Sequence, residues 1–157
     1  MDSNIDCLLA LIDEAFEKKA WHGPNLRGSI RGVTARQAAW RSSDERHNIW
    51  EIVLHAAYWK YIVRRRLLGE KRGSFPVKGS NWFVRPVALT EPAWRDDIHL
   101  LDDQHRKLRA AIVGLDPRQV NRTPPGSKIS NLRLIYGVAS HDVYHSAQIQ
   151  LLKRLMK

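Results

Sequence analysis

Two histidines near the end of the chain have the spacing of a metal-binding pair on a helix. His141 and His145 are four positions apart, with no Gly or Pro between them. At about 100° per residue they lie roughly one turn apart on nearly the same face of a helix. Reading outward at spacings of three and four gives an apolar stripe that includes both imidazoles: Leu134, Val138, His141, His145, Ile149 and Leu152. Buried imidazoles need partners, because an unpaired buried polar group costs about 1–3 kcal/mol.

A third histidine, His55, occupies the core-facing stripe of another predicted helix, which reads Asn48, Ile52, His55, Trp59 and Ile62. Two histidines on one helix, taken alone, favour a packed core over a ligand pair. A third imidazole from a second helix makes a metal site the favoured interpretation, because bundle metal sites are built from inward-facing side chains on facing helices. Three neutral imidazoles with an open coordination position are the catalytic rather than the closed structural pattern. His47, about 80° around the axis from His55, is predicted to be exposed.

His105 is the fourth histidine with a core-facing position, on the stripe Trp94, Ile98, Leu101, His105, Leu108, Ile112 and Leu115. Two interpretations are open for it. It can pair with the neighbouring Asp102 or Asp103 at the surface, or it can supply a fourth ligand that closes the metal site. His99 lies off the stripe.

Four long segments have helical periodicity, and no segment has convincing strand alternation. The first runs from about Asn4 to Ala20. The second opens at a capping-box pattern in residues 42–45 and ends at Gly69. The third is capped by Thr90 and ends before residues 116–117, and the fourth is capped by Ser127 or Ser130. A shorter helical turn is predicted after Thr34. These segments predict an all-α four-helix bundle that forms one domain of residues 1–157.

The connection over residues 69–89 is long for a compact domain, where unstructured loops above about 12–15 residues are uncommon and often functional. It contains Phe75, Trp82 and Phe83 among glycines and prolines. We therefore expect it to fold back onto the bundle, either as packing or as a lid over a pocket.

The chain has a formal net charge of +10, which raises the question of nucleic acid. The densest basic run, residues 64–66 followed by Lys71 and Arg72, lies at the end of a predicted helix, where the helix dipole favours cations by about 0.3–1 kcal/mol. Other basic residues alternate with acidic ones, and no nucleic-acid-binding motif is recognisable. A solvated basic face is the favoured interpretation.

The remaining composition points to a cytoplasmic protein that does not enter a membrane. No apolar run approaches the ~20 residues that cross a bilayer. The acidic start of the chain lacks the order of a secretion signal. Cys7 is the single cysteine, so no disulfide within the chain is expected.

The chain resembles the DinB/YfiT-like family of bacterial four-helix-bundle metalloproteins. Three segments carry the resemblance: GPNLRGSIRGVTARQAAWR (residues 23–41), HNIWEIVLHAAYW (47–59) and ASHDVYHSAQIQLLKRL (139–155). In that family a histidine from the second helix and a helical pair near the end of the chain hold a divalent ion, often nickel or zinc and sometimes iron. The resemblance assigns these roles to His55, His141 and His145, the same residues that the stripes select. It also implies a homodimer.

Some related proteins are thiol-dependent transferases or isomerases, so one hypothesis is a metal-dependent enzyme that joins a low-molecular-weight thiol to a small electrophile. Glu51 and Tyr144 are candidates for supporting or proton-transfer roles, and each also has a structural interpretation. Arg85 and Trp82 in the long loop could meet a substrate, although solvated and packed roles are favoured for them. The alternative hypothesis is a non-catalytic metal-binding module with a role in stress.

Overall fold

The structure is a computed structural model that describes residues 3–85 and 89–157. Every regular element in these ranges is a helix, which confirms the predicted all-α bundle. The elements are α1 (Ser3–Phe16), α2 (Leu26–Ser29), α3 (Ala35–Ala39), α4 (Ile49–Leu67), α5 (Glu91–Val113), the 3-10 helix η1 (Pro117–Gln119) and α6 (Asn131–Leu155). None of the described helices combines the length and the apolarity that crossing a bilayer requires.

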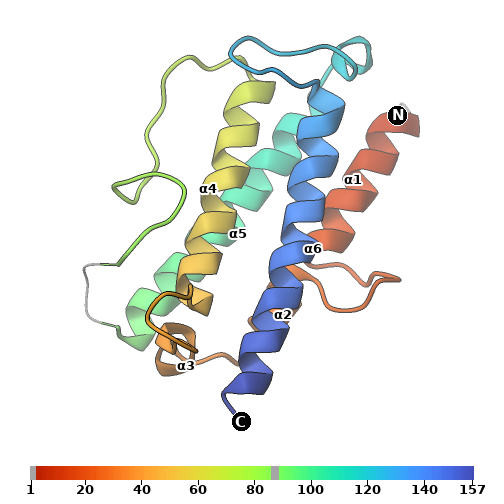
Figure 1. Cartoon of the computed structure of the whole chain (residues 1–157). Coiled ribbons are helices and arrows are strands. Elements are labelled where there is room, and N and C mark those ends of the chain that lie inside the picture. The colour runs from red at the N-terminus through yellow and green to blue at the C-terminus, as the bar shows by residue number, and fades with distance from the viewer. Residues whose placement is uncertain (1–2, 86–88) are drawn as a thin grey trace.

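The four long helices pack side by side, with α4 against α5 and α6, and α1 against the same two helices (Figure 1). Helices α4 and α5 run in the same direction, so the chain must return along the whole bundle between them (Figure 1). With 19 residues, α4 is about 28 Å long at about 1.5 Å per residue. This topology is the physical reason for the long connection that the sequence contains.

Helix α4 begins later than predicted, because the capping box is formed by Asn48 and Glu51 rather than by residues 42–45. The side chain of Asn48 accepts a hydrogen bond from the Glu51 amide, and Glu51 accepts one from the Asn48 amide. Arg41 binds the Glu51 carboxylate and also donates to the Arg46 carbonyl oxygen at 2.7 Å. These contacts hold the segment before Asn48 in a turn, where the sequence pattern predicted a helix.

Helix α1 ends at Phe16 and not near Ala20. The amides of Glu17 and Lys18 both donate to the Asp13 carbonyl oxygen, at 2.9 and 2.8 Å, which tightens the last turn and turns the chain out of the helix. Other predicted caps are confirmed. Thr34 forms the capping box of α3, Thr90 caps α5, and Ser130 is the cap of α6.

An ion pair between Lys60 of α4 and Asp142 of α6 is enclosed in the bundle. Both side chains are 0% exposed, and the ammonium contacts the carboxylate directly. Burial raises the pKa of Asp142 to about 6, and the positive charge of Lys60 acts in the opposite direction. The pair therefore connects two long helices through charges that neutralise each other.

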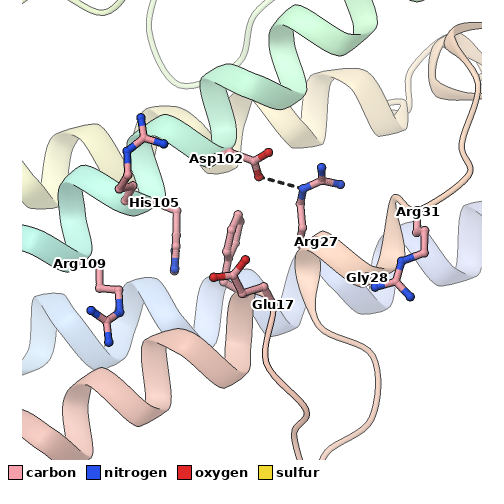
Figure 2. A pocket seen from close by; sticks show the side chains of 9 residues that line it. Glu17, Arg27, Gly28, Arg31, Asp102, His105 and Arg109 are labelled. Atoms are coloured by element: carbon pink, nitrogen blue, oxygen red, sulfur yellow. Dashed lines mark hydrogen bonds and ion pairs between the residues drawn. The ribbon is translucent and has the colours of Figure 1, made fainter.

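The His105 side chain of α5 points toward α1 (Figure 2). Its ring stacks on Phe16, with 3.7 Å between the ring centroids. Its Nε2 atom is 4.0 Å from Asp13, too far for a hydrogen bond. The Asp13 carboxylate instead accepts bonds from Arg109 and Lys18. Burial, supported by the charge of Lys60, lowers the pKa of His105 to about 3, so its ring is neutral.

Candidate metal centre

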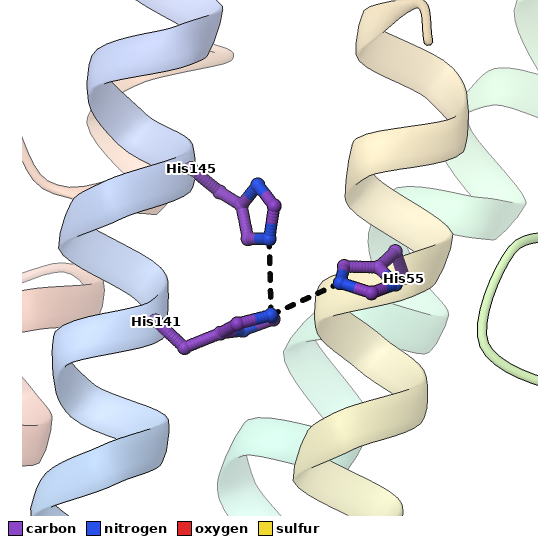
Figure 3. A group of neighbouring side chains, drawn as sticks. All are labelled: His55, His141 and His145. Carbon is purple, nitrogen blue, oxygen red and sulfur yellow. Dashed lines mark hydrogen bonds between the residues drawn. The ribbon is translucent and has the colours of Figure 1, made fainter.

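The structure brings the three predicted ligands together between α4 and α6. The Nε2 atom of His141 lies 3.0 Å from the Nε2 atom of His55 and 3.0 Å from that of His145 (Figure 3). One ring nitrogen from each residue lies within 4.8 Å of the other two. His55 and His145 are 6% and 3% exposed, and His141 is half-buried.

Hydrogen bonds on the far side of two rings fix which nitrogen carries the proton. His55 Nδ1 lies 2.8 Å from the carbonyl oxygen of Asn81, which can only accept, so Nδ1 is the donor. His145 Nδ1 lies 2.6 Å from Oε1 of Gln148, whose amide NH2 group donates to the Tyr144 hydroxyl at 3.2 Å. In both neutral rings Nε2 is therefore left with a lone pair that points into the cluster.

Two lone pairs facing one ring nitrogen cannot both be satisfied by hydrogen bonds. His141 Nε2 lies 3.0 Å from each of them and can donate at most one hydrogen. A cation at the centre would satisfy all three nitrogens. In a tetrahedral site with Zn–N bonds of ~2.0–2.1 Å, the ligand nitrogens are about 3.3–3.4 Å apart, close to the spacing here. The residues fit a divalent ion.

Burial keeps the three imidazoles in the form that binds metals. Burial lowers the pKa of all three rings. The pKa of His141 falls to about 3 and that of His145 to about 4, and the pKa of His55 is also below its usual value. The charges of neighbouring imidazoles lower the His141 and His145 values further, while the bond to Gln148 acts in the opposite direction at His145. A neutral ring needs no deprotonation before it binds a cation, so the cluster is ready to act as a ligand set near neutral pH.

The long connection supplies part of this centre. The Trp82 ring lies between His55 and His47, with centroid distances of 3.8 and 3.6 Å and ring planes within 5° of parallel in both pairs. Asn81 adopts a left-handed conformation with φ 63°, and its side chain accepts a hydrogen bond from Trp59 at 2.9 Å. This anchor holds the Asn81 carbonyl oxygen against the His55 ring.

The two phenylalanines of the connection pack on the bundle, as expected for a loop that folds back. Phe83 is 2% exposed, and the Phe75 and Phe83 rings both lie against Tyr58. The loop thus combines packing with direct contact to a histidine of the cluster. That the loop also acts as a lid over a pocket remains a prediction.

A pocket of about 530 Å³ opens beside His145. Its wall combines His47, Trp82, Tyr144 and Gln148 with aliphatic side chains of α4 and α6, among them Ile52, Leu151 and Leu152. A volume in the range of ~300–1,000 Å³ is typical of small-molecule sites. The histidine cluster therefore borders a space in which a small ligand can be held.

Two other sequence candidates have structural roles. The Glu51 carboxylate is occupied by Arg41, by His47 at 3.0 Å and by the first turn of α4. Arg85, expected to be solvated or to meet a substrate, is partly buried and forms an ion pair with the buried Asp97 at 2.7 Å. Tyr144 is exposed, and its ring contacts His145 edge-on at 5.1 Å, so it remains a candidate supporting residue.

His105 is not a member of the histidine cluster that the described residues form. The other interpretation, a surface pairing with Asp102 or Asp103, is also wrong, because neither ring nitrogen has a hydrogen-bond partner among the described residues. Asp102 instead binds Arg27 at 2.8 Å, and Asp103 binds Arg106 and Lys107. Packing against Phe16 directs the imidazole away from these carboxylates.

Asn81 and Gln148 contact the cluster but were not among the predicted site residues. Gln148 is three residues after His145 on the same helix, a spacing at which side chains meet, so this partner could have been found from the sequence. Asn81 acts through its backbone oxygen, and no residue type at that position predicts such a contact.

Comparison with known proteins identifies the family. Residues 20–149 match the family described as the DinB superfamily, and the chain belongs to it. The match includes all three histidines of the cluster, and metal binding agrees with this membership. No curated protein and no solved structure gives a significant match.

Proposed function

We propose that His55, His141 and His145 bind one nickel, zinc or iron ion, and that the protein is a metal-dependent transferase or isomerase that uses a low-molecular-weight thiol. The observation that carries the proposal is the convergence of three ring nitrogens, two with fixed lone pairs, beside a pocket. A divalent ion bound there would lower the pKa of a bound thiol and so supply a nucleophile near neutral pH.

The side chains around the cluster have roles in this proposal. The Asn81 carbonyl oxygen and Gln148 keep two ligand rings in the required tautomer. Trp82 covers one face of His55, and the aliphatic side chains near Leu151 give the pocket in which thiol and electrophile would meet an apolar side. The Tyr144 hydroxyl, positioned by Gln148, can form a hydrogen bond to a ligand in the pocket.

The alternative proposal is a non-catalytic metal-binding module. A fourth protein ligand that closed the site would favour it, and His105 was the sequence candidate. The cluster formed by the described His, Cys, Asp and Glu residues has three members, and His145 also lines a pocket, which supports an open site. A cytoplasmic homodimer remains part of the proposal, and light scattering of the purified protein tests the dimer.

Cobalt substitution separates the two proposals. Untagged protein loaded with Co²⁺ is titrated with a small thiol such as cysteine, and its visible absorption is recorded. We expect a new thiolate-to-cobalt band that is absent in His55→Ala, followed by consumption of the thiol when a small electrophile is added. A thiol-induced band without turnover would support the module, and a spectrum that no thiol perturbs would contradict the transferase.

A further inference from the structure

A second cavity, of about 640 Å³, lies between α1, α2 and α5 (Figure 2). It shares no lining residue with the pocket beside His145. Four arginines line it, from α5 and from the α2 region: Arg27, Arg31, Arg106 and Arg109. The acidic side chains in its wall are Glu17 and Asp102, so its lining carries more positive than negative charge.

Two of these arginines have N–H groups that no described residue accepts. Among the described residues Arg27 binds only Asp102, through Nε at 2.8 Å, which leaves its terminal nitrogens available (Figure 2). Arg31 is exposed and has no side-chain partner within the described part of the chain. A guanidinium has five N–H donors in a planar fork that matches the oxygens of carboxylates and phosphates.

The wall of the cavity also contains the unsatisfied imidazole of His105. This side chain is 4% exposed, and neither ring nitrogen has a hydrogen-bond partner among the described residues. Its ring points from α5 toward α1, and in the view of Figure 2 it lies between Arg109 and Arg27. Because the ring is neutral, it has one N–H donor and one acceptor, both unused. A buried group in this state costs about 1–3 kcal/mol, which a suitable ligand would recover.

We propose that this cavity is a binding site for a small molecule that carries a phosphate or carboxylate group. Arg27 and Arg31 bind the oxyanion, and His105 donates a hydrogen bond from the wall of the cavity. Arg109 is bound to Asp13 through two bonds, at 2.8 and 3.1 Å, and contributes positive potential without leaving its partner. The site is independent of the metal centre, so it does not rest on the proposed function.

Titration of the metal-loaded protein tests the site. Inorganic phosphate, glycerol phosphate and citrate are added in turn, and binding is followed by calorimetry and by the ring ¹⁵N resonances of His105. We expect saturable binding of at least one anion, with a shift of the His105 resonances. The phosphate and citrate arms distinguish a phosphate from a carboxylate ligand.

Two arginine variants provide the matched comparison. Arg31 and Arg36 are both exposed, and neither side chain has a partner among the described residues, but only Arg31 lines the cavity. Arg31→Gln should weaken anion binding at least about tenfold, the effect of losing one hydrogen bond to a charged group. Arg36→Gln and the metal-site variant His55→Ala should retain it. Equal affinity in Arg31→Gln and Arg36→Gln, unmoved His105 resonances, or no saturable response to any of the three anions would overturn the proposal.

Discussion

Helices α4 and α6 enclose two polar clusters that differ in how they are completed. Lys60 and Asp142 are fully buried and bring opposite charges, so the pair is satisfied within the chain. A few residues away on the same helices, His55, His141 and His145 bring three ring nitrogens together, and the chain supplies no cation for them. Burial alone therefore does not distinguish a structural polar cluster from a binding site. The difference lies in whether the chain supplies both partners.

The largest expected effect comes from breaking the buried ion pair between Lys60 and Asp142. Lys60→Ala leaves a buried carboxylate without its counter-charge, which should lower the free energy of unfolding by about 3–5 kcal/mol. The double variant Lys60→Met/Asp142→Leu replaces the pair by apolar groups and should recover most of this loss. Urea unfolding measures both variants. A loss below about 1 kcal/mol in Lys60→Ala would show that the pair does not stabilise the bundle.

His105 sharpens the comparison, because it is a buried histidine outside both clusters. Its folded pKa of about 3 is below the 6.5 of an unperturbed histidine side chain, so the ring takes up a proton at higher pH in the unfolded chain than in the folded one. The neutral His105 ring therefore contributes to the free energy of unfolding. This contribution is complete above pH 6.5 and is lost toward pH 3 at ~1.4 kcal/mol per pH unit. His105→Leu should remove this dependence and lose less stability than the wild type between neutral pH and about pH 4.5.

The exposed His99 is the control for this experiment, because His99→Gln should keep the pH dependence of the wild type. Unfolding free energies at several pH values give the comparison. A pH dependence that is the same in His105→Leu and the wild type would contradict the buried neutral state of His105.

Within the histidine cluster, the supporting bond from Gln148 has a smaller and measurable effect. Gln148→Ala removes the acceptor that fixes the tautomer of His145, and we expect zinc affinity to fall about 10–100-fold. Gln150→Ala, two residues further along the same helix, is the matched control and should bind zinc as the wild type does. Competition with a chromophoric chelator measures both, and equal affinities would show that the Gln148 bond is dispensable.

The smallest effect is expected at His47, which stacks on the outer face of Trp82 but is not part of the cluster. His47→Ala should cost about 0.5–1.5 kcal/mol of stability, the range of an aromatic pair, and leave the metal content unchanged. Thermal unfolding and elemental analysis test the two parts. Loss of the metal in this variant would mean that His47 is a ligand.

The positions of the three histidines could be predicted because helix periodicity determines which side chains face a neighbour. Both His55 and His145 lie on stripes whose apolar members, such as Ile52 and Ile149, are buried as expected. The predicted start of α4 was wrong because two capping patterns compete in the sequence. The contacts of Arg41 with Glu51, which only the folded chain makes, favour the later one.

Partners that come from distant segments could not be predicted. Lys60 and Asp142 are 82 positions apart, and each looks like an ordinary charged residue until the two helices meet. The same holds for the Asn81 carbonyl oxygen, whose position depends on the path of the long connection along the bundle. Periodicity determines the face of a helix, but it does not determine which side chain the facing helix or loop presents.

The most direct test of the metal centre is the metal content of untagged protein purified from its native host, measured beside His55→Ala. The account predicts about one divalent ion per chain in the wild type and none in the variant, with the variant still folded because the Lys60–Asp142 pair is intact. Wild-type protein without a bound metal, or a His55→Ala variant that retains it, would contradict the account.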